Sequence, residues 1–124
     1  MQTITPAQLR DLIEQQRPLS VLRTFDSEET PRELLPFKAE ALLDLALPEE
    51  AQACLDSITE PLEADMQLYA QVLRAYLVIG SGKIDQGMLQ VKESLSADVS
   101  PYYRAFAHGC LARCYASKGC PDLA

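Results

Sequence analysis

The chain has 124 residues, 48 % hydrophobic and 23 % charged, which is the size and composition of one soluble globular domain that needs no disulfide or metal to hold its core. Eleven Lys and Arg against 18 Asp and Glu give a net charge of −7. This argues against nucleic acid or a membrane as the main partner, because both attract basic surfaces. With no Trp, a single His and five Gly, most catalytic arrangements lack their parts, so we expect no enzyme.

The N-terminus lacks the basic and apolar regions of a signal peptide, and the apolar run at 75–79 is far shorter than a membrane span. We therefore expect a cytoplasmic protein with reduced cysteines. Two of the cysteines are four residues apart on a predicted helix, where parallel side chains rarely form a disulfide. The four cysteines are Cys54, Cys110, Cys114 and Cys120.

Helical periodicity runs along the whole chain, and no segment shows the strict alternation of a strand. Thr5 with Gln8, and Thr30 with Glu33, have the spacing of helix-capping boxes. Proline at the first turn is a helix start signal, and Pro61 closes the fourth helix. The first four helices are predicted to open at Pro6, Pro18, Pro31 and Pro48.

Three longer helices follow, predicted over about residues 62 or 64 to 79, 83–97 and 101–118. Gly80 is the expected left-handed residue that ends the first of them, and Gly119 ends the last. The segment 121–124 has the sequence of an opening eighth helix. The prediction is an all-α chain of about seven helices.

An internal repeat appears at the start of every second helix. The segments 48–51, 84–87 and 121–124 occupy the same place, with 18–21 as a looser copy. The last residues of these three segments are Ala51, Gly87 and Ala124. The first two are 36 residues apart, and the last two are 37 residues apart. A small residue stands at the turn before each segment, namely Ala46, Gly82 (or Gly80) and Gly119.

In these residues the chain resembles the tetratricopeptide repeat family, which stacks antiparallel helix pairs with a period near 34. The best copy is 111–119 followed by 121–124. An earlier copy matches if Ser81-Gly82 is a two-residue insertion, through Tyr69, Val72, Tyr76, Gly80 and Gly87. A weaker copy uses Leu35, Ala39, Leu42, Ala46 and Ala51.

The resemblance implies a single domain, a short right-handed α-solenoid with units of roughly 5–29, 30–61, 62–99 and 100–124. It also implies that the first helix of each unit lines a concave groove. With the insertion, three arginines and one glutamate fall at equivalent places on these helices. These four charged residues form either a clamp for an acidic partner segment or a solvated polar stripe. Apolar residues near them either contact a bound helix or strand or belong to the core. The predicted groove residues are Arg10, Glu40, Leu43, Arg74, Leu77, Phe106 and Arg113.

A second cluster, His108 with Cys110, Cys114 and Cys120, has metal-like chemistry but lacks the short Cys spacing of structural zinc sites. Free Cys is common at packed helix faces, so packing is the favoured interpretation. We therefore expect no metal, no cofactor and no catalytic residue.

The sequence favours a non-catalytic module that binds a partner peptide or amphipathic helix in its groove, with a role as a small secretion-type chaperone as one form of this function. A second hypothesis is an N-terminal fragment of a larger scaffold or regulator, which the unfinished helix at 121–124 favours. The third is a metal or redox protein that uses the C-terminal cysteines. An uncapped C-terminal helix would also allow homo- or hetero-oligomers.

Overall fold

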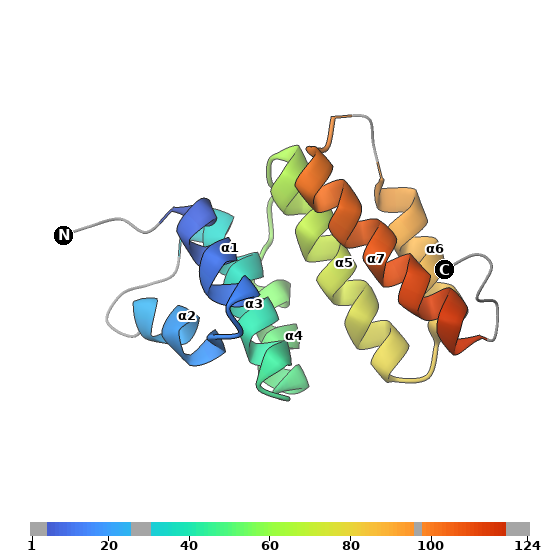
Figure 1. The fold of residues 1–124 in the computed structure, drawn as a ribbon, viewed down its shortest axis with the longest axis horizontal. Helices are drawn as coiled ribbons and strands as arrows, with labels where there is room; N and C mark the ends of the chain where they lie inside the picture. The colour runs from blue at the N-terminus through green and yellow to red at the C-terminus, as the bar shows by residue number, and fades with distance from the viewer. Residues whose placement is uncertain (1–4, 26–30, 96–97, 119–124) are drawn as a thin grey trace. The chain divides into compact units, whose positions relative to one another are not determined.

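A computed structural model describes residues 5–25, 31–95 and 98–118. These residues form seven α-helices, one 3-10 turn and no strand, so the all-α prediction is confirmed (Figure 1). The helices are α1 (Pro6–Glu14), α2 (Pro18–Thr24), α3 (Leu35–Asp44), α4 (Pro48–Asp56), α5 (Ala64–Gly80), α6 (Ile84–Ser94) and α7 (Pro101–Ser117). None of them is long and apolar enough to cross a lipid bilayer.

The chain divides into two compact units, Met1–Glu60 and Pro61–Ala124. The N-terminal unit holds α1 to α4 and the C-terminal unit holds α5 to α7. The division falls at Pro61, where the sequence predicts the end of the fourth helix.

Most of the helices begin at the residues where the sequence predicts a start. Thr5 and Gln8 form a complete capping box, and α2 and α4 begin at their prolines. Thr30 lies outside the described residues, and the third helix opens instead as the 3-10 turn Arg32–Leu34. The sixth helix ends at Ser94, short of the predicted 97, because the backbone of Leu95 is already extended.

One turn occurs three times, between α1 and α2, α3 and α4, and α5 and α6. Its central residue is left-handed: Gln16 (φ 56°), Ala46 (φ 60°) and Gly82 (φ 95°). In each copy this residue donates its N–H to the carbonyl three residues back, and the next residue donates to the carbonyl five residues back. These two bonds define the Schellman motif, which satisfies the last carbonyls of a helix. The three helix pairs are therefore copies of one hairpin.

The prediction that Gly80 is the left-handed residue at the end of the fifth helix is wrong. It is the last residue of α5, Ser81 is the cap, and Gly82 is the left-handed residue. The Schellman bonds fix this choice, because Gly82 donates to Ile79 at 2.9 Å and Lys83 donates to Val78 at 3.3 Å. Gly82 therefore aligns with Gln16 and Ala46, and no two-residue insertion is needed.

Each hairpin has one buried residue on each helix at the same distance from the turn. The residue seven positions before each left-handed residue and the residue five positions after it are both buried. At Gly87 the two helices of the third hairpin approach closely, because an added Cβ would lie 2.5 Å from Cγ1 of Ile79 and 3.1 Å from the carbonyl oxygen of Ala75. The three pairs are Leu9 with Val21, Ala39 with Ala51, and Ala75 with Gly87.

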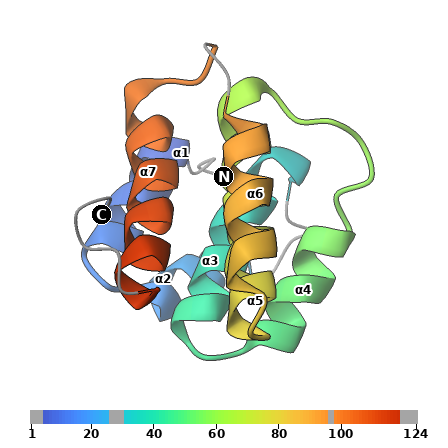
Figure 2. The same cartoon turned by 90° about the vertical axis from the view of Figure 1, so that its right-hand side faces the viewer.

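In each unit, a later helix packs against both helices of the hairpin that precedes it. In the N-terminal unit α3 packs on α1 and α2, and in the C-terminal unit α7 packs on α5 and α6 (Figure 1; Figure 2). The backbone N–H of Ser100 donates to Oδ1 of Asp65 at 2.7 Å, which ties the start of α7 to the start of α5. This arrangement places side chains of α5 and α7 against each other, where the candidate site lies.

Candidate functional site

The predicted groove residues are divided between the two units. Arg10, Glu40 and Leu43 belong to the N-terminal unit, and each is half-buried. Arg74, Leu77, Phe106 and Arg113 belong to the C-terminal unit. Of these, the structure brings together Phe106 and Arg113, and it does so through a residue that sequence reasoning did not select, Tyr76.

Aromatic side chains fill the contact between α5 and α7. Tyr69 and Tyr76 are seven residues apart and share one face of α5. The ring of Phe106 lies 5.3 Å from that of Tyr69, edge to face at 86°, and 6.3 Å from that of Tyr76. Tyr103 extends the cluster, with its ring 5.3 Å from Tyr69. Such ring pairs add to burial and fix the position of α7 on α5.

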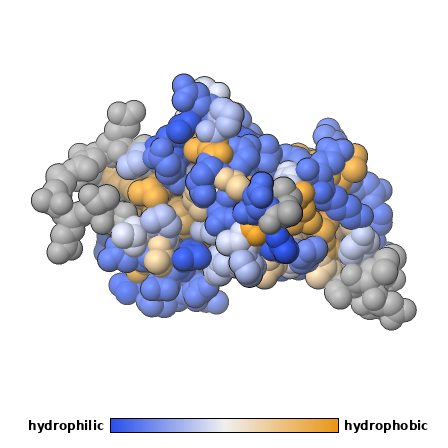
Figure 3. Space-filling model, turned by 90° about the horizontal axis from the view of Figure 1, so that it is seen from above, coloured by the Kyte–Doolittle hydropathy of each residue, from blue (hydrophilic) through white to orange (hydrophobic). Residues whose placement is uncertain are grey.

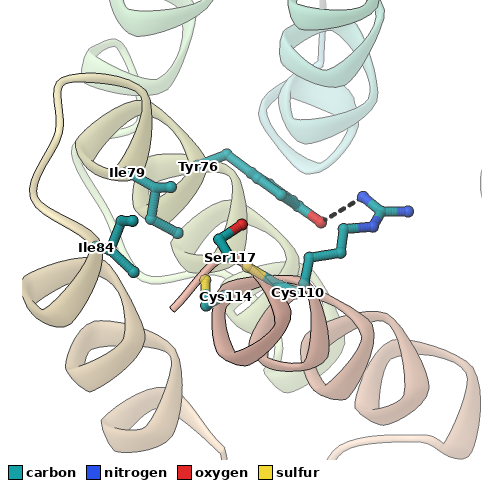
Figure 4. A pocket seen from close by; sticks show the side chains of 7 residues that line it. Tyr76, Ile79, Ile84, Cys110, Cys114 and Ser117 are labelled. Carbon is teal, nitrogen blue, oxygen red and sulfur yellow. Dashed lines mark hydrogen bonds between the residues drawn. The ribbon is translucent and has the colours of Figure 1, made fainter. Parts of the chain in front are cut away.

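Arg113 closes one end of this cluster. Its Nη1 donates a hydrogen bond of 3.0 Å to Oη of Tyr76 (Figure 4). The arginine side chain is exposed, while Tyr76 is half-buried and Phe106 lies on the same stripe of α7. The hydrogen bond therefore holds a solvent-exposed guanidinium beside an aromatic surface.

In the C-terminal unit the turn aligns Tyr76, and not Arg74, with Arg10 and Glu40 of the predicted row. Tyr76 stands six residues before the left-handed Gly82, as Arg10 and Glu40 stand six residues before theirs. Arg74 is two residues away from Tyr76, so its side chain leaves α5 about 200° around the helix axis from the tyrosine. The error comes from the assumed insertion at Ser81-Gly82. A register counted back from Gly82 would have selected Tyr76.

A small pocket of about 60 Å³ lies next to the Tyr76–Arg113 hydrogen bond, between α5, the start of α6 and the end of α7 (Figure 4). This volume is far below the several hundred Å³ of a typical small-molecule site. Besides Tyr76 and Arg113, the pocket is lined by Ile79, Ile84, Cys110, Cys114 and Ser117.

The surroundings of Cys110 in this pocket disfavour ionisation of its thiol. Burial and the neighbouring Cys114 raise the pKa of Cys110 to about 11, against smaller opposing effects of a hydrogen bond with Tyr76 and the charge of Arg113. The Cys110 thiol is therefore protonated at neutral pH. The thiolate is the nucleophile and the metal-binding form, so this group is poorly suited to either role.

The structure describes three of the four cysteines. Cys54, Cys110 and Cys114 are free thiols in the structure, and Cys120 lies outside the described residues. Cys110 and Cys114 are buried packing residues. Within the described part of the chain no group of three metal-ligating side chains occurs. His108 is exposed and points about 200° away from Cys110.

The described surface carries large apolar side chains singly. They lie on different helices or turns, which is ordinary for a folded protein. The face shown in Figure 3 is largely hydrophilic, with apolar groups interspersed. The exposed large apolar residues are Leu19, Leu47, Leu89 and Tyr102.

Comparison of this chain with models of known families, with curated proteins and with solved structures finds no match. The tetratricopeptide-like resemblance therefore stays a prediction that rests on the residues quoted for it.

Proposed function

We propose that this chain is a non-catalytic module that binds another protein, and that it holds an acidic peptide segment or amphipathic helix of that partner against α5 and α7. The observation that carries this proposal is the exposed guanidinium of Arg113, held at 3.0 Å by Tyr76. A guanidinium has five N–H donors and matches a carboxylate in a two-pronged geometry.

The hydrogen bond to Tyr76 leaves this charge intact, because its acceptor is a neutral phenol. A partner carboxylate would then meet a cation whose position is already fixed, which lowers the entropy lost on binding. The neighbouring rings of Tyr76 and Phe106 offer apolar contact beside the charge. The protonated Cys110 thiol fits a binding surface better than a nucleophilic one.

The repeated helical hairpin also supports the proposal that this chain binds another protein. Three hairpins with one turn type are the building units that a tetratricopeptide-like solenoid would require, and such arrays commonly bind segments of other proteins. A secretion-type chaperone is one form that such binding takes. A larger scaffold with further hairpins is the alternative.

The test is affinity capture from the cells that make this protein, followed by quantitative mass spectrometry. Wild-type bait is compared with Arg113→Glu, Arg113→Lys and Lys83→Glu, the last being an exposed cation of the α5–α6 turn. A partner is expected that Arg113→Glu loses, Arg113→Lys retains weakly and Lys83→Glu retains fully. Equal recovery by all four baits would remove Arg113 from the binding surface.

A further inference from the structure

The pocket between α5, α6 and α7 opens beside the guanidinium on which the proposed function depends. Tyr76 and Arg113 line this pocket and are also joined by the hydrogen bond of 3.0 Å. In Figure 4 the hydroxyl of Tyr76 points away from Ile79 and Ile84, which lie at the other side of the pocket. The pocket therefore has a cationic end at Arg113 and an aliphatic end at the two isoleucines.

The interior of the pocket is suited to an apolar group. Cys110 and Cys114 are at most 4 % exposed, and burial raises the pKa of Cys110 to about 11, which keeps its thiol neutral. Ser117 contributes a neutral hydroxyl from an exposed position at the end of α7. None of the described lining residues is acidic. A charged group placed beyond Arg113 would lose its hydration without gaining a partner, whereas an aliphatic group would gain burial.

The volume of the pocket limits the size of that group. A water-sized group occupies about 10–15 Å³ of such a cavity, so a pocket of about 60 Å³ has room for about four to six of them. The side chain of leucine or isoleucine has this size, whereas the rings of phenylalanine and tryptophan are too large. An alanine would leave most of the space empty and lose the contacts with the walls.

The two ends of the pocket require that a bound carboxylate and a bound aliphatic side chain are neighbours. Arg113 itself lines the pocket, so a carboxylate on its guanidinium lies at the rim of the space that the aliphatic group fills. Residues three or four positions apart are neighbours on a helix, and residues two apart share a face in an extended segment. Both groups therefore come from one short segment of a partner.

We propose that this pocket is a subsite for one leucine or isoleucine side chain of the partner protein, located within about four residues of the Asp or Glu that Arg113 binds. The inference rests on the proposed function, because it needs that carboxylate. It adds an aliphatic anchor, which selects among acidic segments that charge alone would not distinguish.

The probe is a phage-displayed library of random linear peptides, selected on the full-length chain. The recovered peptides are expected to share an Asp or Glu with a Leu or Ile within about four positions of it. A synthetic peptide of the shared sequence should bind about tenfold more weakly, or worse, when its Leu or Ile is replaced by Ala. Fluorescence anisotropy of the labelled peptide measures this loss.

Two variants change the pocket and leave the guanidinium in place. Ile84→Ala enlarges the aliphatic end, so the recovered peptides should then favour Phe or Met over Leu and Ile. Ser117→Leu fills the pocket from its exposed end, so the preference for Leu or Ile should disappear while the acidic residue is kept. Ala116→Leu is the matched control, because Ala116 is exposed on the same helix and is not a lining residue, and it should select the wild-type peptides. Circular dichroism checks that each variant is folded.

The outcomes separate this inference from the function on which it rests. An acidic preference that Arg113→Gln abolishes, with no preference for Leu or Ile, would keep the proposed function and remove the subsite. Recovery of no shared sequence, or of sequences that Arg113→Gln leaves unchanged, would overturn both. Self-association in sedimentation that Ser117→Leu abolishes and Ala116→Leu does not would also overturn the inference, because the occupant would then be a second copy of this chain.

Discussion

The left-handed residue of the hairpin turn is a glutamine, an alanine and a glycine in the three copies, although the backbone has a positive φ in each. A left-handed conformation costs an L-residue about 1–2 kcal/mol, a cost that glycine avoids. Ala46 therefore carries strain at its φ of 60°, while Gly82 relieves it at φ 95°.

Two opposite substitutions test this assignment. Ala46→Gly should raise the free energy of unfolding by about 0.5–1 kcal/mol, and Gly82→Ala should lower it by about 1–2 kcal/mol. Urea denaturation followed by circular dichroism measures both. Stabilisation by Gly82→Ala would show that the third turn has another geometry.

The buried thiol of Cys110 predicts a dependence of stability on alkaline pH. Its pKa is about 11 in the folded protein, raised by burial from the ordinary value of 9.0. The unfolded chain therefore releases this proton first, so the contribution of the neutral thiol is complete below pH 9 and is lost as the pH rises toward 11.

The difference in unfolding free energy between wild type and Cys110→Ala isolates this effect, because the other titrating groups are common to both proteins. The difference should shrink as the pH rises from 9 to 11 and stay constant between pH 7 and 8.5. A constant difference across the whole range would mean that Cys110 titrates normally in the fold.

At the level of elements, Gly87 and Gly109 are both inside helices but have opposite surroundings. An added methyl at Gly87 would strike Ile79 and the carbonyl of Ala75, whereas nothing lies within 4 Å of a Cβ at Gly109. Gly109→Ala should therefore stabilise the protein by about 0.5–1 kcal/mol through helix propensity. Gly87→Ala should destabilise it, because α6 must move away from α5.

Thermal unfolding of the two variants measures this contrast, and each serves as the control for the other. A gain in melting temperature for Gly87→Ala would mean that α5 and α6 do not approach as closely as described.

Helix beginnings were more predictable than helix ends. Proline and the pair Thr5 and Gln8 act locally, so they can be read from a few residues. The end of α5 could not be chosen in this way, because Gly80 and Gly82 are both suited to a left-handed turn. The choice is made by hydrogen bonds to Val78 and Ile79, and the wrong choice of glycine aligned Arg74, instead of Tyr76, with Arg10 and Glu40.

At the level of the whole molecule, the repeat was visible in the sequence, and the division into two compact units falls at Pro61, the predicted end of a helix pair. The turns and the buried crossing residues recur at fixed spacing, so a pattern of residue types reveals them. The pairing of Arg113 with Tyr76 depends on how α7 lies against α5, and spacing alone does not specify that contact.

The two units predict localised effects of core truncation. Leu55→Ala in the N-terminal unit and Leu73→Ala in the C-terminal unit each remove a fully buried leucine and should cost about 2–5 kcal/mol. Hydrogen exchange should show the larger loss of amide protection within the unit that carries the substitution. Equal loss in both units for either variant would show that the chain unfolds as one cooperative body.

Site-specific photo-cross-linking tests most directly whether a partner protein binds against α5 and α7. A photoreactive residue is placed at Ser117, on the stripe of Arg113 and Phe106, and at Ala53 on α4 as the matched exposed control. We predict a covalent adduct with one protein at Ser117, lost in the Arg113→Glu background, and none at Ala53. Absence of any adduct at Ser117, or the same adducts at both positions, would contradict binding at this face.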